Sequence, residues 1–127
     1  MPHKLALLTL PERFAVCKLE ANAAVPSWAT SGSLVSITRT ADELSVVCPQ
    51  AVIPEGVTCE RDWCCVRVAG RMDFAMIGVV ASLVNPLADS GISVFVLSTF
   101  DTDYLLVKGD DWDRAVDALR LAGHQVS

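Results

Sequence analysis

The segment of residues 73–108 constrains the fold of this chain more than any other part of the sequence. Apolar residues recur in its first part at helical spacing, with Asp73 as a candidate N-cap and Gly91 as a candidate helix-ending glycine. Two runs rich in β-branched and aromatic residues follow, at residues 92–100 and 104–108, separated by a polar turn. The segment therefore predicts a helix, a tight glycine turn and a β-hairpin.

Strand and helix patterns flank this segment on both sides. Residues 63–68 form a short apolar run that is typical of a buried strand, and residues 125–126 can return as a last strand. Residues 110–122 have the apolar stripe of an amphipathic helix, with Asp110 as a candidate N-cap. The resulting order, β-α-β-β-α-β, is that of the ferredoxin-like fold. The sequence thus predicts an α+β fold in which helices cover one face of an antiparallel sheet.

The first half of the chain repeats this pattern in a shorter form. Four runs have the length and composition of strands, at residues 4–10, 14–19, 34–40 and 44–48. Only a short helix around Trp28 fits between the second and third runs. Residues 37–44 match residues 97–104 in pattern, which indicates an internal repeat.

The two halves define the expected domain organisation. Residues 49–58 contain two prolines and a glycine, a composition typical of a linker. We therefore expect two tandem ferredoxin-like units, an abbreviated one at residues 1–58 and a complete one at residues 59–127.

Composition and charge argue against several classes of partner. The net charge is −5 and the sequence has no basic cluster, so nucleic acid is not an expected partner. No apolar run reaches the roughly 20 residues that span a membrane, and the N-terminal residues lack a signal-peptide layout. We therefore expect a cytoplasmic protein without a membrane partner.

The cysteines and the known catalytic motifs give no support for an enzyme or a metal protein. The five cysteines lack paired C-x-x-C spacing, and neither histidine lies near them in sequence. We expect five free thiols, most of them buried. The sequence contains no G-x-S-x-G, Walker or dinucleotide-binding motif. We expect no catalytic residues, no metal and no cofactor.

Several segments carry a resemblance to a known family. They are residues 14–19, 36–40 and 42–45, and above all the blocks Gly91-Ile92-Ser93-Val94-Phe95 and Ser98-Thr99-Phe100-Asp101-Thr102-Asp103-Tyr104. The chain resembles the ACT-domain family over nearly all of its length. Within that family it is similar to small bacterial proteins with two ACT units that resemble the CASTOR arginine sensors. CASTOR proteins carry four ACT units in one chain, whereas this chain has two.

The resemblance implies a function and a site. ACT domains are regulatory modules that bind amino acids, usually where two such domains meet. The ligand's amino-acid end is expected against the turn after the helix, and the CASTOR resemblance adds the hairpin loop. The implied ligand-binding residues are Gly91, Ile92, Ser93, Val94, Thr99, Phe100 and Asp103. A site between equivalent C-terminal units would have to form between two chains, which implies a homo-oligomer and favours a dimer.

These residues also have purely structural interpretations. Gly91 suits the end of any helix, Asp103 suits a turn, and an aromatic such as Phe100 is common in cores and interfaces. Three functions therefore stay open. The favoured one is an amino-acid sensor whose ligand, of unknown identity, binds at an ACT–ACT interface. The others are an oligomerisation module with a degenerate site, and a regulatory partner of an amino-acid biosynthetic enzyme such as an aspartate kinase.

Overall fold

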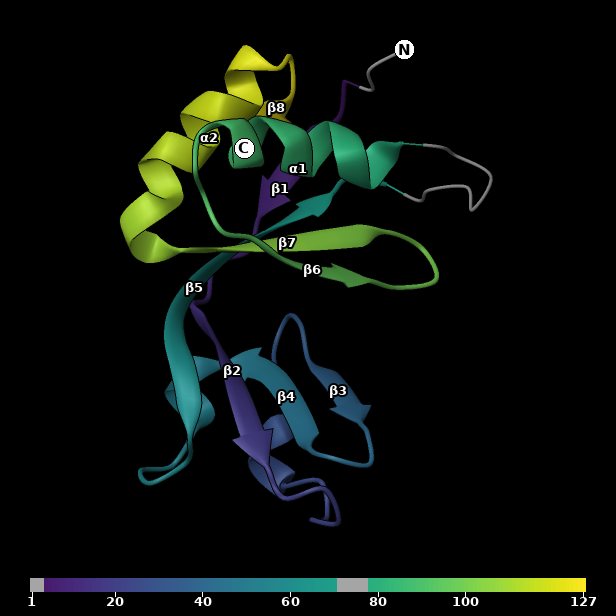
Figure 1. Cartoon of the computed structure of the whole chain (residues 1–127), viewed down its shortest axis with the longest axis vertical. Helices are drawn as coiled ribbons and strands as arrows, with labels where there is room; N and C mark the ends of the chain where they lie inside the picture. The colour runs from purple at the N-terminus through teal and green to yellow at the C-terminus, as the bar shows by residue number, and fades with distance from the viewer. Residues whose placement is uncertain (1–3, 71–77) are drawn as a thin grey trace. The chain divides into compact units, whose positions relative to one another are not determined.

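The computed structural model describes residues 4–70 and 78–127, which divide into two compact units (Figure 1). The large unit combines the described residues up to Leu10 with those from Cys64 onward, and the small unit is Pro11–Trp63. The chain thus starts the large unit, builds the whole small unit, and then returns. Strand β5 (Cys59–Val68) contributes its first half to the small unit and its second half to the large one.

The large unit is a sheet with two helices on one face, as Figure 1 shows. Its elements are β1 (Ala6–Thr9), the second half of β5, α1 (Val79–Asp89), β6 (Phe95–Ser98), β7 (Asp103–Lys108), η3 (Gly109–Asp111), α2 (Trp112–Leu121) and β8 (Gln125–Val126). From β5 to β8 they follow the expected β-α-β-β-α-β order, and the strands lie in the order β6-β7-β5-β1-β8. The predicted α+β, ferredoxin-like fold is confirmed, with one strand added.

The added strand, β1, departs from the sequence-based expectation in two ways. It pairs with β5, with Leu7 opposite Val68, so the run at residues 4–10 belongs to the large unit and not to a unit at residues 1–58. It also pairs in parallel with β8, with Leu7 opposite Val126, in a sheet expected to be antiparallel throughout. The reason is burial: Leu7 is 1% exposed within the core of the large unit.

One continuous cluster of buried apolar side chains fills the space between the sheet and the helices of the large unit. Each helix contributes at its apolar stripe, Leu83 and Leu87 from α1 and Ala115 and Leu119 from α2. Helix α1 begins at Val79, after Gly78, in the described residues; the expected N-cap Asp73 lies outside them. No helix in the two described ranges combines the length and apolar character needed to cross a bilayer.

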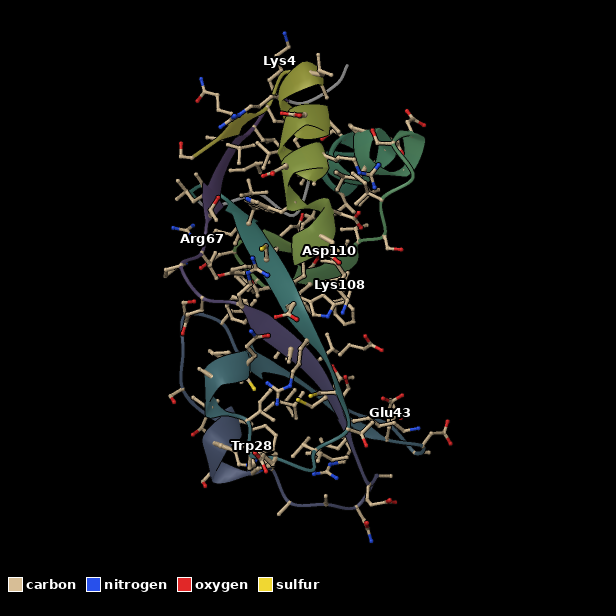
Figure 2. All side chains as sticks on the ribbon, turned by 90° about the vertical axis from the view of Figure 1, so that its left-hand side faces the viewer. Lys4, Trp28, Glu43, Arg67, Lys108 and Asp110 are labelled. Carbon is tan, nitrogen blue, oxygen red and sulfur yellow. The ribbon has the colours of Figure 1, made fainter. Side chains whose placement is uncertain are left out.

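The small unit is an abbreviated version of the same plan. Its elements are β2 (Phe14–Leu19), η1 (Ser27–Ala29), β3 (Ser36–Arg39), β4 (Leu44–Pro49), η2 (Gln50–Val52) and the first half of β5. The strands lie in the order β3-β4-β2-β5, and short 3₁₀ turns stand where the large unit has α-helices. The side chain of Trp28, labelled in Figure 2, packs against the unit's own apolar cluster.

The expected linker is part of the small unit. Pro49 ends β4, residues 50–52 form η2, and Ile53 is buried in the apolar cluster of this unit. The proline-rich composition therefore reflects a tight turn between β4 and β5 rather than a joint between units. The chain passes between the units at residues 10–11 and 63–64 instead of near residue 58.

Candidate functional site

The turn after α1 is a helix cap built around Gly91. Gly91 has φ +72°, and its N–H donates to the carbonyl of Ala88 at 3.0 Å. The N–H of Ile92 donates to the carbonyl of Leu87 at 2.9 Å, which completes a Schellman motif. The turn expected to hold the ligand's amino-acid end therefore uses two of its backbone N–H donors to end the helix.

The side chains of this turn divide between core and solvent. Ile92 is 5% exposed and belongs to the core of the large unit, and the half-buried Val94 packs against it. Ser93 is exposed. The Nη1 atom of Arg114 donates to the carbonyl of Ser90 at 3.0 Å, which fixes α2 to the turn. Of the four candidates here, Ser93 is the one whose side chain faces outward from an ordered cap.

The loop between β6 and β7 is closed by hydrogen bonds of two threonines. The N–H of Thr99 donates to the carbonyl of Thr102 at 2.8 Å, and the N–H of Thr102 donates to the hydroxyl of Thr99 at 3.2 Å. The hydroxyl of Thr102 in turn donates to the carbonyl of Val68 in β5 at 2.9 Å. Sequence reasoning missed this anchoring role of Thr102, although a threonine in a polar turn is a signal for such bonds.

Two candidate residues of this loop have opposite environments. Phe100 is 69% exposed at the tip, whereas Asp103, the first residue of β7, is only 7% exposed. Asp103 shares its face of β7 with Leu105 and Val107, which belong to the helix-covered core. Among the residues that the structure describes, the carboxylate of Asp103 has no hydrogen-bond or ion-pair partner. The loop thus places the carboxylate of a little-exposed residue beside an exposed aromatic ring.

The two groups of candidate residues lie at opposite ends of one strand. The turn at residues 91–94 precedes β6 and the loop at residues 99–102 follows it, as Figure 1 shows. A strand of this length separates them by more than about 13 Å. One chain therefore brings Thr99, Phe100 and Asp103 together, but it does not bring them to Gly91, Ile92, Ser93 and Val94.

The cysteines are mostly buried thiols. Four of the five are buried, Cys59 is half-buried, and none of them forms a disulfide in the part of the chain that the structure describes, which includes all five. Burial raises the pKa of Cys17 and of Cys65 to about 12 in each case. Among the described residues, no group of three or more His, Cys, Asp or Glu side chains is arranged to hold a metal ion.

His124 is a structural residue that sequence reasoning did not identify. Its ring is 4% exposed, and Nδ1 accepts a hydrogen bond from the N–H of Leu5 at 3.1 Å. Its Nε2 lies 2.9 Å from the carbonyl of Ser82, so the neutral ring that carries its proton on Nε2 satisfies both contacts. The ring therefore joins α1 to the chain segment that leads into β1. A single histidine near the end of a sequence gives no pattern from which this role follows.

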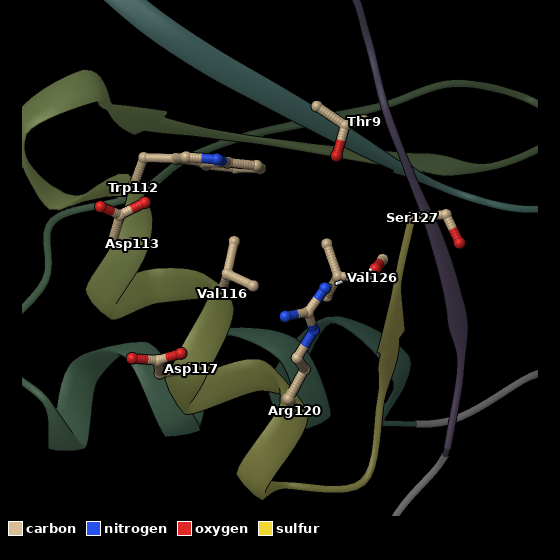
Figure 3. A pocket seen from close by; sticks show the side chains of 8 residues that line it. All are labelled: Thr9, Trp112, Asp113, Val116, Asp117, Arg120, Val126 and Ser127. Atoms are coloured by element: carbon tan, nitrogen blue, oxygen red, sulfur yellow. Dashed lines mark hydrogen bonds between the residues drawn. The ribbon is translucent and has the colours of Figure 1, made fainter.

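Two surface pockets lie away from the candidate residues. One, of about 350 Å³ in the large unit, is lined by Trp112, Val116 and Val126, and Figure 3 shows Arg120 at its side donating to the carbonyl of Val126 at 3.0 Å. The other, of about 390 Å³ in the small unit, is lined by Lys18, Leu19, Glu20, Asp42 and Thr58. None of the seven predicted ligand-binding residues lines either pocket.

Comparison with protein families agrees with this architecture. Residues 58–120 match the model of the ACT domain, and residues 12–56 match the model of an N-terminal domain family. The chain belongs to the ACT-domain family. The predicted family resemblance is confirmed, and the ACT match covers β5, both helices and the β6–β7 hairpin.

Relatives of this ACT protein include arginine sensors and bacterial proteins. The curated relatives are the cytosolic arginine sensors for mTORC1, subunit 1, with 37% identity in Mus musculus and 36% in Homo sapiens over 59 residues. That match covers 46% of this chain and only 18% of the length of those relatives. A crystal structure of an Agrobacterium tumefaciens protein is 41% identical with a TM-score of 0.94, over 98% of this chain and 93% of that one.

One further solved structure shares the fold at low identity. The regulatory subunit of aspartate kinase from Thermus thermophilus has a TM-score of 0.62 at 9% identity, over 89% of this chain and 93% of that one. Since sequence identity is this low, the likeness establishes a common fold only.

Proposed function

We propose that this protein is a regulatory sensor that binds a free amino acid through Asp103, at an interface between two copies of the chain. One observation carries the proposal: Asp103 is 7% exposed as a residue, and no described residue forms a hydrogen bond or ion pair with its carboxylate. A carboxylate that no protein group neutralises can accept a charge-assisted hydrogen bond from a cationic ligand group. The fitting ligands are therefore amino acids that present their ammonium group or a basic side chain.

The loop around Asp103 is suited to binding with little reorganisation. The hydrogen bonds of Thr99 and Thr102 hold it closed before any ligand arrives, so little conformational entropy remains to be lost. The exposed ring of Phe100 can cover the apolar part of a ligand or stack on a cationic group. The mammalian relatives are named as arginine sensors, and arginine is an amino acid with a cationic side chain.

A second copy of the chain would let the two separated groups of expected ligand-binding residues contribute to one site. The turn at residues 91–94 and the Asp103 loop lie at opposite ends of β6, so they can face one ligand only if different chains supply them. Strand β6 pairs with β7 and lies at one end of the order of the described strands. We propose that two chains associate and place Ser93 of one near Asp103 of the other.

The test is a binding assay on the wild-type chain and two matched variants. A thermal-shift screen of the common amino acids selects a ligand, and calorimetric titration then measures its affinity. Asp103→Asn is expected to weaken binding about tenfold to a hundredfold, since it removes a charge-assisted hydrogen bond. Asp101→Asn, a change of the same chemistry on an exposed neighbour, is expected to bind like wild type.

The outcomes separate the alternatives. Unchanged affinity in Asp103→Asn would mean that the site lies elsewhere. If no amino acid shifts the melting temperature while the protein still dimerises in solution, the oligomerisation module with a degenerate site is the better description. A regulatory role beside an aspartate kinase is supported by a common fold alone. Co-purification with such an enzyme would be the evidence that favours this role.

A further inference from the structure

Three of the five cysteines lie together on the sheet of the small unit. Cys17 is in β2, Cys48 is in β4, and Cys59 begins β5. Cys59 is directly opposite Cys17, and Cys48 is opposite Ala15, two residues along β2 from Cys17. Because side chains two residues apart share a face of a strand, the three thiols share one face of the sheet. On that face, Cys17 and Cys48 belong to the apolar cluster of the small unit, and Cys59 packs against it.

The strand register distinguishes one pair from the other. The N–H of Lys18 donates to the carbonyl of Thr58 at 2.9 Å, so the neighbouring pair of Cys17 and Cys59 is a non-hydrogen-bonded pair. Such pairs have Cα atoms about 4.5 Å apart, within the range of about 4.4–6.8 Å that disulfides accept. Cys48 is diagonal to Cys17, at about 7–8 Å, which is beyond that range.

Exposure assigns different roles to the two thiols of the close pair. Cys17 is 1% exposed, and its burial, together with the nearby Cys48 and Cys59 thiols, raises its pKa to about 12. Cys59 is half-buried and so is open to a small reagent from solvent. Cys59 is therefore the thiol that reacts first with an oxidant, and the buried Cys17 is the second thiol, which can react with the oxidised Cys59.

We propose that Cys17 and Cys59 form a reversible disulfide when the protein meets a hydroperoxide. The Cys59 Sγ attacks the peroxide oxygen, the O–O bond breaks, and the leaving oxygen takes a proton, which leaves a sulfenic acid on Cys59. The Cys17 Sγ then attacks the Cys59 sulfur, the S–O bond breaks, and the departing hydroxide takes the Cys17 proton to form water. With hydrogen peroxide, two thiols are oxidised to one disulfide and the peroxide is reduced to two waters.

The disulfide has a mechanical consequence within the small unit. It closes a loop of roughly 40 residues that includes β3 and β4, and it fastens β2 to β5. Cross-linking a loop of this length removes conformational freedom from the unfolded chain, so the oxidised protein melts at a higher temperature than the reduced one. This modification site is independent of the proposed amino-acid site.

Peptide mapping of the whole protein tests the proposal directly. The chain is treated with hydrogen peroxide, remaining thiols are blocked with N-ethylmaleimide, and the protein is digested without reductant. Trypsin alone leaves Cys48 and Cys59 on one peptide, residues 40–61, so a glutamate-specific protease is added to cut after Glu55. The expected product joins the peptide of Cys17 to that of Cys59, and dithiothreitol separates them.

Two variants provide matched controls. Cys48→Ser is expected to keep both the linked peptide and the rise in melting temperature on oxidation, whereas Cys59→Ser is expected to lose both. If a variant folds poorly, the peptide map of the wild-type protein alone still tests whether Cys17 and Cys59 are linked. A link between Cys17 and Cys48, a link between two chains, or a Cys59 oxidised to sulfinic acid without any link would overturn the proposal.

Discussion

The hydroxyl of Thr102 donates a hydrogen bond of 2.9 Å to the carbonyl of Val68, and this bond ties the β6–β7 loop to the last residue of β5. Thr102→Val keeps the shape of the side chain but leaves that carbonyl without its partner. We expect a loss of about 1–3 kcal/mol in the free energy of unfolding, measured by urea denaturation. Thr102→Ser retains the hydroxyl and should lose clearly less. A larger loss in Thr102→Ser than in Thr102→Val would show that the methyl group, and not the hydrogen bond, matters here.

Asp103 should lower the free energy of unfolding of the protein when no ligand is bound. Because Asp103 is little exposed and no described residue pairs with its carboxylate, Asp103→Asn removes a negative charge that no described group neutralises. We expect the free energy of unfolding without ligand to rise by about 1 kcal/mol or more. The measurement is urea denaturation in amino-acid-free buffer. A fall in stability would instead assign Asp103 a structural partner and would weaken the proposed site.

His124 should stabilise the large unit through its two ring contacts. His124→Ala leaves the N–H of Leu5 and the carbonyl of Ser82 without their partner and opens a cavity. We expect a loss of about 2–4 kcal/mol, seen as a lower urea midpoint. His124→Asn places a side-chain oxygen near the position of Nδ1 and should recover part of the loss. Faster hydrogen exchange of the Leu5 amide in the alanine variant would locate the effect.

The raised pKa of Cys65 predicts that the protein loses stability at alkaline pH. Burial, and then the neighbouring Cys64, raises the pKa of Cys65 to about 12, whereas the thiol of the unfolded chain titrates near its ordinary value of 9.0. The folded state is therefore favoured by the neutral Cys65 thiol in full below pH 9, and this contribution to the free energy of unfolding is lost as the pH rises from 9 toward 12. The loss is about 1.4 kcal/mol for each pH unit in this window. Urea denaturation at pH 8 and pH 10 should show it, and Cys65→Ala should reduce the dependence while the part due to Cys17 remains.

The large unit should fold without the small one if its first strand is kept. Residues 7, 8 and 9 pair with residues 68, 67 and 66, and the N–H of Leu10 donates to the carbonyl of Cys65 at 2.9 Å. Replacing residues 11–64 with Asn-Gly therefore joins β1 to β5 through a two-residue hairpin turn. We expect cooperative thermal unfolding of this variant.

The matched control for that variant is residues 64–127 alone, which lack β1. This fragment loses Leu7 from the core and exposes one edge of β5, so it should be unfolded or self-associated. Circular dichroism and analytical ultracentrifugation measure both properties. A well-folded monomeric fragment would contradict the role given to β1.

Local patterns in the sequence were sufficient to find most elements but not their partners. Residues 14–19 were predicted as a strand and form β2 with the same bounds, because alternation along one strand is a local property. The run at residues 4–10 was also recognised as a strand, yet its pairing with β5 and β8 depends on segments far along the chain. Such pairing is decided by which core buries Leu7, and the pattern of one segment does not contain that information.

The candidate site shows the same division between local and non-local information. Gly91 was correctly placed at a helix end, since its left-handed φ is a local requirement. The extended run at residues 92–100 is shorter in the structure, where β6 is Phe95–Ser98, because Ile92 completes the helix cap and enters the core. The burial of Asp103 depends on residues packed around it from other elements. It could not be read from the turn in which it lies.

The early departure of the chain from the large unit sets an order for folding during synthesis. All strands of the small unit are complete once residue 63 has left the ribosome, so this unit can fold while the rest is still being made. Strand β1 emerges before them but waits for β5, and then for Gln125 and Val126, before both of its edges are paired. Strand β1, which is made before the small unit, is thus among the last of the described strands to be covered, and until then its apolar side chains are available to chaperones.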